Sequence, residues 1–316
     1  MNKTLILLEF SNGSLRKSSL SAVSFALQAG ASFEILLVGY GIGAQAESVR
    51  NLGANCVLVA DDISLAQPLA DKYAQVIVET VRARQVSLVA AATSTFAKDI
   101  LPRAAAILDA PMVSDVVSVD ACGAFRRIMY SGTVLATVEL GAEIKFATVR
   151  SSSFVAPSPV EKISPIEVFA AGQFTFSSLS TFVSFEQKID SRLDAADARV
   201  VVTGGRAIKN AADFERLVGG VADSVGGAIG CSRALVDLGI TSNSLQIGQT
   251  GKTVAPELYL GIGVSGAIQH VAGMRDSRVI AAINSDAAAP IFEIADVGLV
   301  ADIYEVVPEL IQKLKM

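Results

Sequence analysis

Short apolar runs recur through the first third of the chain, and their pattern predicts buried β-strands. The runs are TLILLEF, FEILLVG, CVLVA and SLVAAA. They lack the polar alternation of half-exposed strands, which is typical of a parallel sheet covered on both faces. Stretches with helical character lie near them, at residues 18–30, 43–53, 68–85 and 97–109. The alternation of strands and helices along the chain predicts a doubly wound, Rossmann-like α/β domain.

The pattern becomes richer in β-type segments from about residue 112. These segments are FRRIMYSGTVLATVEL, EIKFATVR, PIEVFA and FTFSSLSTFVSF, and we expect them to add strands to the edge of the first sheet. The most polar stretch of the chain follows at residues 186–198, and its composition predicts a linker. The first domain is therefore expected to span residues 1–190.

The second half of the chain repeats the α/β pattern without repeating the sequence. Its apolar runs RVVVT, LYLGIGV, RVIAAIN and GLVAD predict strands, and a last helix is expected over residues 303–315. We therefore predict a second doubly wound domain at residues 191–316, of the flavodoxin-like type.

Composition narrows the classes of partner. The 316 residues are 51% hydrophobic and 18% charged, with a formal net charge of -5. This balance supplies no basic surface for nucleic acid. No apolar run reaches the roughly 18 to 20 residues that span a bilayer, so we expect no membrane insertion, and a subunit contact would cover part of the apolar excess. The first residues are interpreted as a strand rather than an export signal.

The three cysteines indicate neither a disulfide nor a zinc site. Cys56, Cys122 and Cys231 are odd in number, far apart and without CxxC spacing. Such usage is typical of a reducing compartment. No cluster of metal-ligating residues with short spacing is present, so no metal site is predicted.

Glycines and small polar residues gather where the predicted strands of the second half end. In an open α/β sheet, ligands bind in the crevice outside the carboxyl ends of the strands. Ser265 is expected to cap a helix over AIQHVAG, with the helix amides facing that crevice. The first half shows such residues at one strand end only. The strand-end residues are Gly204, Gly205, Arg206, Gly263, Ser265, Gly266, Asn284, Ser285, Asp286 and Asp302 in the second half, and Ser94, Thr95, Lys98 and Asp99 in the first.

Other motifs exclude several chemistries. QIGQTGKT resembles the phosphate-binding pattern GxxxxGK[ST], but Gln246 stands where its first glycine is required. His270 is the only histidine, and no GxSxG elbow or reactive cysteine accompanies it. Taken singly, Arg206 and Arg233 fit solvated helix arginines, and His270 fits a packed helix histidine. Any redox or transfer chemistry must therefore come from a cofactor.

Long segments of the chain resemble the alpha subunits of electron transfer flavoprotein. IGQTGK is followed by VAPELYLGIGVSGAIQHVAGM and then by AAINSDAAAPIFEIADVGLVADI. The segments VVVTGGRAIK, GCSRALVDLG, KDILPRAAAILDAPMVSDV and RIMYSGTVLATV resemble the same family. The likeness covers most of the chain, and its strongest motifs lie in residues 200–302.

The resemblance implies a heterodimer of alpha and beta subunits that holds one FAD, with AMP in the beta subunit. The second domain would be the FAD-binding domain, and the first would contact the beta subunit. The protein would be an electron carrier without substrate chemistry of its own, passing electrons one at a time from flavin dehydrogenases, such as the acyl-CoA dehydrogenases of fatty acid oxidation, to a membrane quinone oxidoreductase. We expect it in the bacterial cytoplasm or, after processing, in the mitochondrial matrix.

The FAD contacts that the resemblance implies fall on four parts of the second domain. His270 and Arg233 would stabilise negative charge on the reduced ring, giving an anionic semiquinone. Thr250 and Gln249 would contact N5 and a ring carbonyl. Ser232, Ser265 and Gly266 would serve the pyrophosphate, while Asn284 and Asp302 would serve the adenosine end. The full set is Arg206, Ser232, Arg233, Gly248, Gln249, Thr250, Ser265, Gly266, Ala267, Ile268, Gln269, His270, Asn284, Asp302 and Ile303.

Two residues depart from the family pattern, and two alternative functions stay open. Ser285 stands where many members have lysine, so one phosphate contact is expected to be weaker or to be supplied by another residue, and Val297 replaces an aromatic residue. The first alternative is the alpha subunit of a bifurcating electron transfer flavoprotein. The second is a nicotinamide-linked oxidoreductase on a similar fold, against which the absence of GxGxxG after a strand argues.

Overall fold

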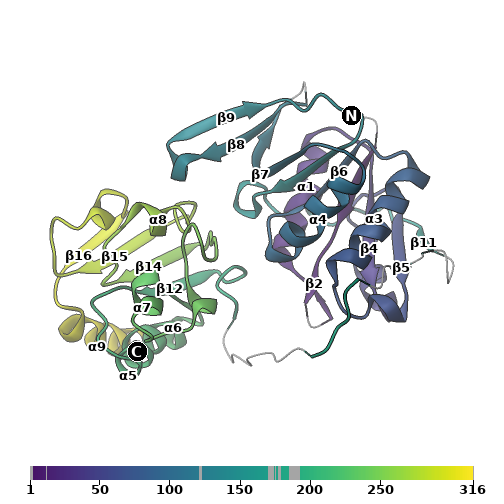
Figure 1. Cartoon of the computed structure of the whole chain (residues 1–316). Helices are drawn as coiled ribbons and strands as arrows, with labels where there is room; N and C mark the ends of the chain where they lie inside the picture. Colours follow the sequence, from purple (N-terminus) through teal and green to yellow (C-terminus); the bar gives the residue numbers. More distant parts are fainter. Residues whose placement is uncertain are drawn as a thin grey trace. The chain divides into compact units, whose positions relative to one another are not determined.

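The chain folds into two compact units, residues 1–186 and 187–316 (Figure 1). The computed structural model describes residues 3–11, 13–120, 123–169, 174, 176, 179–184 and 193–315. The predicted domain boundary after residue 190, most of the predicted linker over residues 186–198 and the thiol of Cys122 lie outside the described residues. Each unit is built around its own sheet.

The first unit contains a nine-stranded sheet of mainly parallel strands. Its order is β11-β5-β4-β1-β6-β10-β7-β8-β9. Only the β7–β8 and β8–β9 pairs run antiparallel among the pairs of this sheet that the structure describes. The strands are β1 (Thr4–Leu7), β4 (Phe33–Gly39), β5 (Val57–Asp61), β6 (Leu88–Ala92), β7 (Met112–Val119), β8 (Phe125–Met129), β9 (Val134–Val138), β10 (Lys145–Val149) and β11 (Ile166–Val168).

Helices cover both faces of this sheet, which confirms the doubly wound prediction. On one face, α1 (Leu20–Gln28) and α2 (Gly43–Ser48) bury their apolar side chains in one core cluster. On the other, α3 (Ala70–Arg84) and α4 (Thr95–Ile107) share a second cluster. Strands β1, β4, β5 and β6 hold runs of buried apolar residues because both of their faces are covered.

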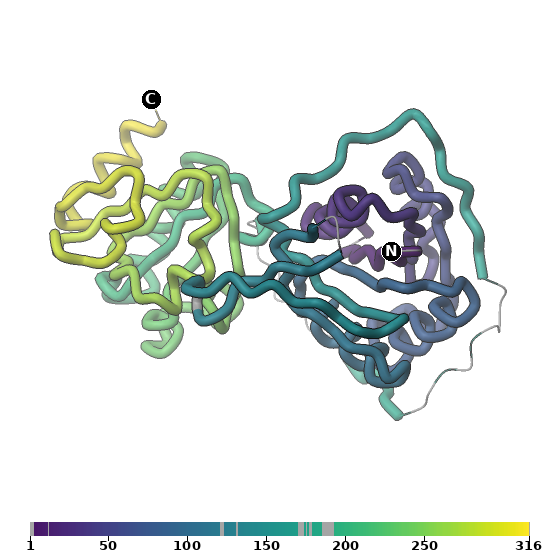
Figure 2. The backbone as a smooth tube through the Cα atoms, turned by 90° about the horizontal axis from the view of Figure 1, so that it is seen from above, coloured from purple at the N-terminus to yellow at the C-terminus, as the bar shows by residue number. Residues whose placement is uncertain are grey.

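The expectation that all later β-segments join one edge is only partly right. Strand β10 lies inside the sheet, between β6 and β7, where Phe146, Ala147 and Val149 are fully buried. Strand β11 pairs with β5 at the opposite edge. The hairpin of β8 and β9 forms the predicted added edge and reaches beyond the rest of its sheet (Figures 1 and 2). The described residues of FTFSSLSTFVSF form no strand.

The second unit contains five parallel strands in the order β13-β12-β14-β15-β16. Numbered within the unit, this order is 2-1-3-4-5, that of flavodoxin-like folds, so the predicted fold class is confirmed. Strand β13 was missed because its four residues sit in a run of glycines and small side chains. The strands are β12 (Val200–Gly204), β13 (Ala228–Cys231), β14 (Leu258–Ile262), β15 (Ile280–Asn284) and β16 (Val297–Val300).

The second unit contains two longer helical segments and two short helices that follow its strands. A continuous helical stretch runs over residues 211–225, through α5 (Ala211–Asp213), a wider π-type turn and α6 (Gly220–Val225). It packs on α9 (Ile303–Leu314), which is the last helix predicted over residues 303–315. Two short helices follow strands β13 and β14: α7 (Arg233–Asp237) and α8 (Ile268–Val271). No helix in the described part of the chain has the length and apolar character to cross a bilayer.

Candidate functional site

A cavity of about 330 Å³ lies in the second unit at the carboxyl edge of its sheet. Its lining comes from the loops that follow β12, β13 and β14 and from the loop at residues 246–250. The lining residues are Arg206, Ser232, Arg233, Ala234, Asp237, Gln246, Ile247, Gly248, Gln249, Thr250, Val264, Ser265, Ala267, Gln269 and His270.

The position of the cavity follows from the strand order. The order 2-1-3-4-5 reverses direction between β12 and β14, and the connections leave these neighbours toward opposite faces. A crevice opens where they diverge, at Gly204 and Ile262. The glycine after β12 is required there, because a Cβ on Gly205 would overlap the backbone of Gly263.

The loop at residues 246–252 forms one wall and is fixed at both ends. Isolated parallel β-bridges join the backbone of Cys231 to that of Gln246 and the backbone of Ile247 to that of Lys252. The Gln249 amide donates to the Gln269 carbonyl at 2.7 Å, which ties this loop to α8. Gln246 Nε2 donates to Thr250 Oγ1 at 2.9 Å, so the Thr250 hydroxyl proton is directed to another acceptor.

His270 is a neutral, buried member of the lining. His270 is only 6% exposed, and its Nε2 lies 2.6 Å from the hydroxyl oxygen of Tyr259. Burial lowers the pKa of His270 from its ordinary 6.5 to about 4, although the carbonyl of Ile247 acts in the opposite direction. No group in the described part of the chain bonds to Nδ1 with normal geometry.

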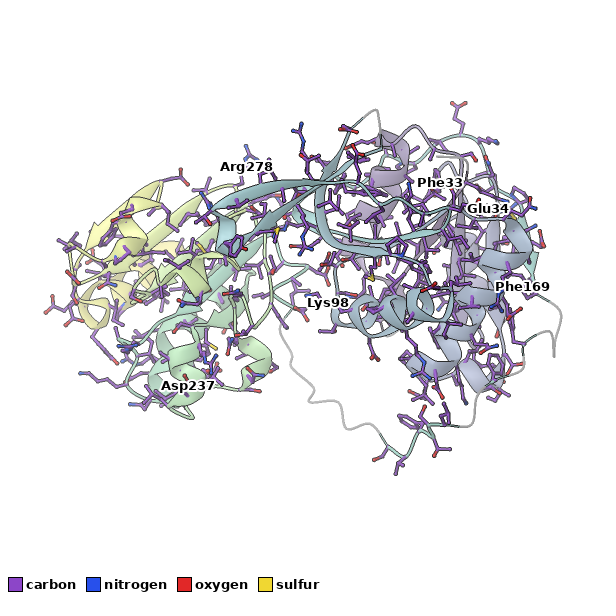
Figure 3. All side chains as sticks on the ribbon, turned by 45° about the horizontal axis from the view of Figure 1, so that its top comes forward. Phe33, Glu34, Lys98, Phe169, Asp237 and Arg278 are labelled. Atoms are coloured by element: carbon purple, nitrogen blue, oxygen red, sulfur yellow. The ribbon has the colours of Figure 1, made fainter. Side chains whose placement is uncertain are left out.

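Two exposed arginines and one carboxylate set the charge of the cavity. Arg233 begins α7, and its Nε lies 3.5 Å from Asp237 Oδ2, one turn along the same helix (Figure 3 labels Asp237). Arg206 lies on the loop after β12. With His270 neutral, two guanidinium groups face one carboxylate, and this excess of positive charge favours an anionic ligand.

The structure brings most of the predicted FAD contacts to this cavity, but Gly266 and Ile268 do not line it. Gly266 has φ +86°, and a Cβ there would collide with the backbone of Ile291. Its place in the motif is thus explained by a tight approach of two loops. Ile268 is 65% exposed on α8 and lies outside the lining.

The three predicted contacts furthest along the sequence also lie outside the cavity lining. Asn284 Nδ2 donates to the Val264 carbonyl at 2.9 Å and so braces the loop after β14. Asp302 accepts the Tyr304 amide at 2.8 Å and is the N-cap of α9. Ile303 is buried in the core under that helix. Any contact of these three with the adenosine end stays a prediction.

The predicted helix cap at Ser265 is wrong. Helix α8 begins at Ile268, its N-cap is Ala267, and no side chain caps it. The Ser265 carbonyl instead accepts the Ile291 amide at 3.1 Å, and its side chain is exposed at the cavity. Ser232 does stand at the N-cap of α7, but its side chain makes no capping bond. The hydroxyl groups of Ser232 and Ser265 are therefore at the cavity, and neither caps a helix.

Five lining residues were not predicted. Asp237 could have been found, since it stands four residues after Arg233 on a helix that the spacing supports. Gln246 lies inside the QIGQTGK motif, where its side chain was considered only as a departure from a phosphate loop. The other three, Ala234, Ile247 and Val264, present small or apolar surfaces and carry no signal of their own.

The donor set fits a polar organic group better than a metal ion. Hydroxyl, amide and imidazole groups stand beside apolar wall residues, and such mixed walls are typical of cofactor pockets. The described residues contain no group of three or more His, Cys, Asp or Glu side chains placed to hold a metal. Cys56 and Cys231 are buried free thiols.

Comparisons with known proteins match both units. Residues 4–173 match the electron transfer flavoprotein domain, and residues 194–275 match the electron transfer flavoprotein FAD-binding domain, which includes all the lining residues. The chain is 41% identical over 323 residues to the probable mitochondrial electron transfer flavoprotein subunit alpha of Cryptococcus neoformans var. grubii, covering 98% of this chain and 91% of that one. It is 40% identical over 307 residues to the electron transfer flavoprotein subunit alpha of Pseudomonas aeruginosa, covering 97% and 98%.

Proposed function

The chain belongs to the electron transfer flavoprotein family, among its alpha subunits, and from this premise we propose that its cavity holds one FAD that carries electrons singly between other proteins. The observation that carries the proposal is the cavity itself. Most of the residues that the family resemblance assigns to FAD line one hollow at the switch point of a flavodoxin-like sheet. FAD would supply the redox chemistry, and the chain would supply binding and electrostatics.

The residues suit a ring that gains negative charge. His270 would donate a hydrogen bond as a neutral imidazole, since its pKa lies well below neutral pH. Arg233 would add positive charge, which favours the anionic semiquinone. Thr250, whose oxygen already accepts from Gln246, has its hydroxyl proton to donate toward the ring. Gln249 would contact a carbonyl of the flavin ring.

The pyrophosphate and the adenosine end would use different segments. Ser232 and the backbone around Ser265 and Gly266 present polar groups at the cavity edge and would receive the pyrophosphate. Arg206 would add a positive charge near the phosphates. Asn284 and Asp302 would serve the adenosine end, beyond the cavity, at the ends of β15 and β16.

The partners follow from the same premise. We propose a heterodimer with a beta subunit that holds AMP and is contacted by the first unit of this chain. Flavin dehydrogenases, including acyl-CoA dehydrogenases, would donate electrons, and a membrane quinone oxidoreductase would accept them. The carrier would have no substrate chemistry of its own, and it would work in the cytoplasm of a bacterium or in the mitochondrial matrix.

The test is the purification of the chain together with an electron transfer flavoprotein beta subunit from the same organism. We expect flavin absorption bands, one FAD per heterodimer after extraction, and reduction by an acyl-CoA dehydrogenase with its substrate. A preparation without flavin that binds a nicotinamide nucleotide would overturn the proposal. Two FAD per heterodimer would replace it with the bifurcating alternative.

A further inference from the structure

Tyr259 and His270 form a buried polar pair that the proposed electron transfer does not by itself require. Tyr259 is the second residue of β14 and is 0% exposed, while His270 lies on α8 after the same strand. Their side chains meet at 2.6 Å, Oη to Nε2, and the Tyr259 ring is packed in a core cluster while the His270 ring lines the cavity. Buried polar atoms are costly unless they are bonded, so this pair fixes the imidazole in place.

The direction of the bond sets the tautomer of the imidazole. Burial raises the pKa of the Tyr259 phenol, so its hydroxyl keeps its proton and must donate it. Thr203 Oγ1 is the other buried oxygen nearby and acts to lower the pKa of Tyr259, but it makes no hydrogen bond of normal geometry in the described part of the chain. The acceptor within reach is therefore Nε2, and a neutral imidazole that accepts at Nε2 carries its proton on Nδ1.

We propose that Tyr259 is a positioning residue that holds His270 as the Nδ1–H tautomer, so that the ring of this sole histidine presents one fixed donor to the cofactor. Nδ1 makes no hydrogen bond of normal geometry in the described part of the chain, and the Ile247 carbonyl raises the pKa of the ring without making one, so this donor is left for a group bound in the cavity that His270 lines. The inference rests on the proposed flavin site for its purpose. The tautomer itself depends only on this chain.

The first experiment is ¹⁵N NMR of the full chain labelled at the histidine ring and purified without a histidine tag. Because the chain has a single histidine, both ring signals belong to His270. At neutral pH we expect a protonated, pyrrole-like Nδ1 and an unprotonated, pyridine-like Nε2. A proton on Nε2, or a charged ring, would overturn the proposal whether or not flavin binds.

The second experiment replaces Tyr259 by phenylalanine, which keeps the ring and removes the hydroxyl. We expect the tautomer ratio to shift by about tenfold toward Nε2–H, the usual worth of one such bond. The matched control is Tyr73→Phe, a buried tyrosine of the first unit whose hydroxyl donates to the Leu65 carbonyl at 3.0 Å. The control should leave the His270 signals unchanged. If Tyr259→Phe does not fold, the wild-type spectrum alone still decides the tautomer.

A third readout links the pair to the cofactor. In the FAD-loaded heterodimer, Tyr259→Phe should retain FAD but lower the equilibrium constant for uptake of the first electron by about tenfold, with Tyr73→Phe unchanged. An unchanged constant beside a changed tautomer would refute the positioning role. A heterodimer without flavin would instead refute the proposed function and leave the tautomer result standing.

Discussion

The two parallel sheets of this chain differ at their carboxyl edges. In the first unit, some polar groups at that edge are bonded within the unit, although Thr93 Oγ1, directly after β6, makes no hydrogen bond of normal geometry in the described part of the chain. Ser94 Oγ accepts the Ala97 amide at 3.1 Å, and Glu9 pairs with Arg16 at 2.8 Å. In the second unit, the corresponding edge holds a cavity, and polar groups such as His270 Nδ1 lack bonds of normal geometry in the described part of the chain. The feature that sets the second edge apart is therefore the cavity with several polar groups around it, rather than an unbonded polar group alone.

The difference also concerns close backbone approach. In the second unit, the loops after β12 and β14 touch at Gly205 and Gly263, and the loop after β14 meets Ile291 at Gly266. These contacts join three segments, and two of them, the loops after β12 and β14, line the cavity. In the first unit, the loop after β6 instead caps a helix, since the Ser94 side chain accepts the Ala97 amide at the start of α4. The predictions below test this contrast, from the largest effect to the smallest.

Gly266→Ala should give the largest effect and only in the second unit. The new Cβ would collide with the Ile291 backbone and would be held at positive φ, so we expect a loss of about 3 kcal/mol in the free energy of unfolding. Hydrogen exchange resolved by peptide would assign the loss to residues 193–315. Gly141→Ala, where nothing lies within 4 Å, is the control. Equal losses in the two variants would contradict this account of the loop contact.

Acid should weaken the second unit before the first. The folded pKa of His270 is about 4 and its ordinary value is 6.5, so the unfolded chain binds the extra proton between these values. The free energy of unfolding that depends on a neutral His270 is fully present above pH 6.5 and falls as the pH drops toward 4. From pH 7 to 5 we expect a loss of about 2 kcal/mol, measured by urea unfolding of the flavin-free chain.

His270→Gln tests the source of that pH dependence. Glutamine keeps a polar partner for Tyr259 but does not titrate, so the loss between pH 7 and 5 should disappear. The first unit contains no histidine and should show no such loss in either protein. A variant that keeps the full pH dependence would remove His270 from this role.

Arg233→Ala should weaken capture of the first electron by FAD. The guanidinium is 68% exposed, so solvent screens it, and we expect about a fivefold fall in the equilibrium constant at low salt. Stepwise reduction of the heterodimer would show a lower yield of the one-electron state. The control is Arg199→Ala, an exposed arginine of the same unit that pairs with Glu257 away from the cavity. The role given to Arg233 requires that the two variants differ.

Asp237→Asn should give the smallest effect and the opposite sign. The carboxylate lies 3.5 Å from Arg233 and offsets part of its charge, so its removal should raise the same constant about twofold. The shift should shrink as salt is added. A fall in the constant would show that Asp237 holds Arg233 in place rather than neutralising it.

Much of the fold was visible in the sequence, because buried strands and amphipathic helices leave periodic patterns. The helix predicted over residues 68–85 is α3, and the last helix appears at its predicted place. Strand β13 was missed, since a four-residue run of small side chains resembles a loop. The interior place of β10 depends on pairings between distant segments, which periodicity does not report.

The site was visible in part. Strand-end residues such as Arg206 and Ser232 could be placed from the strand order, and the structure gathers them. Tyr259 could not be foreseen as the partner of His270, because the pair joins a strand to a short helix across a turn whose path the sequence does not define. The failed cap at Ser265 has the same cause, since the N-cap of α8 is Ala267, two residues later than expected.

Hydrogen exchange of the heterodimer with and without FAD tests most directly the claim that one sheet edge is a site and the other is not. The account predicts that FAD protects the amides of residues 232–237, 246–250 and 264–270. It predicts no change at the edge of the first unit around Glu9 and Ser94. Protection at that edge, or none around the cavity, would contradict the account.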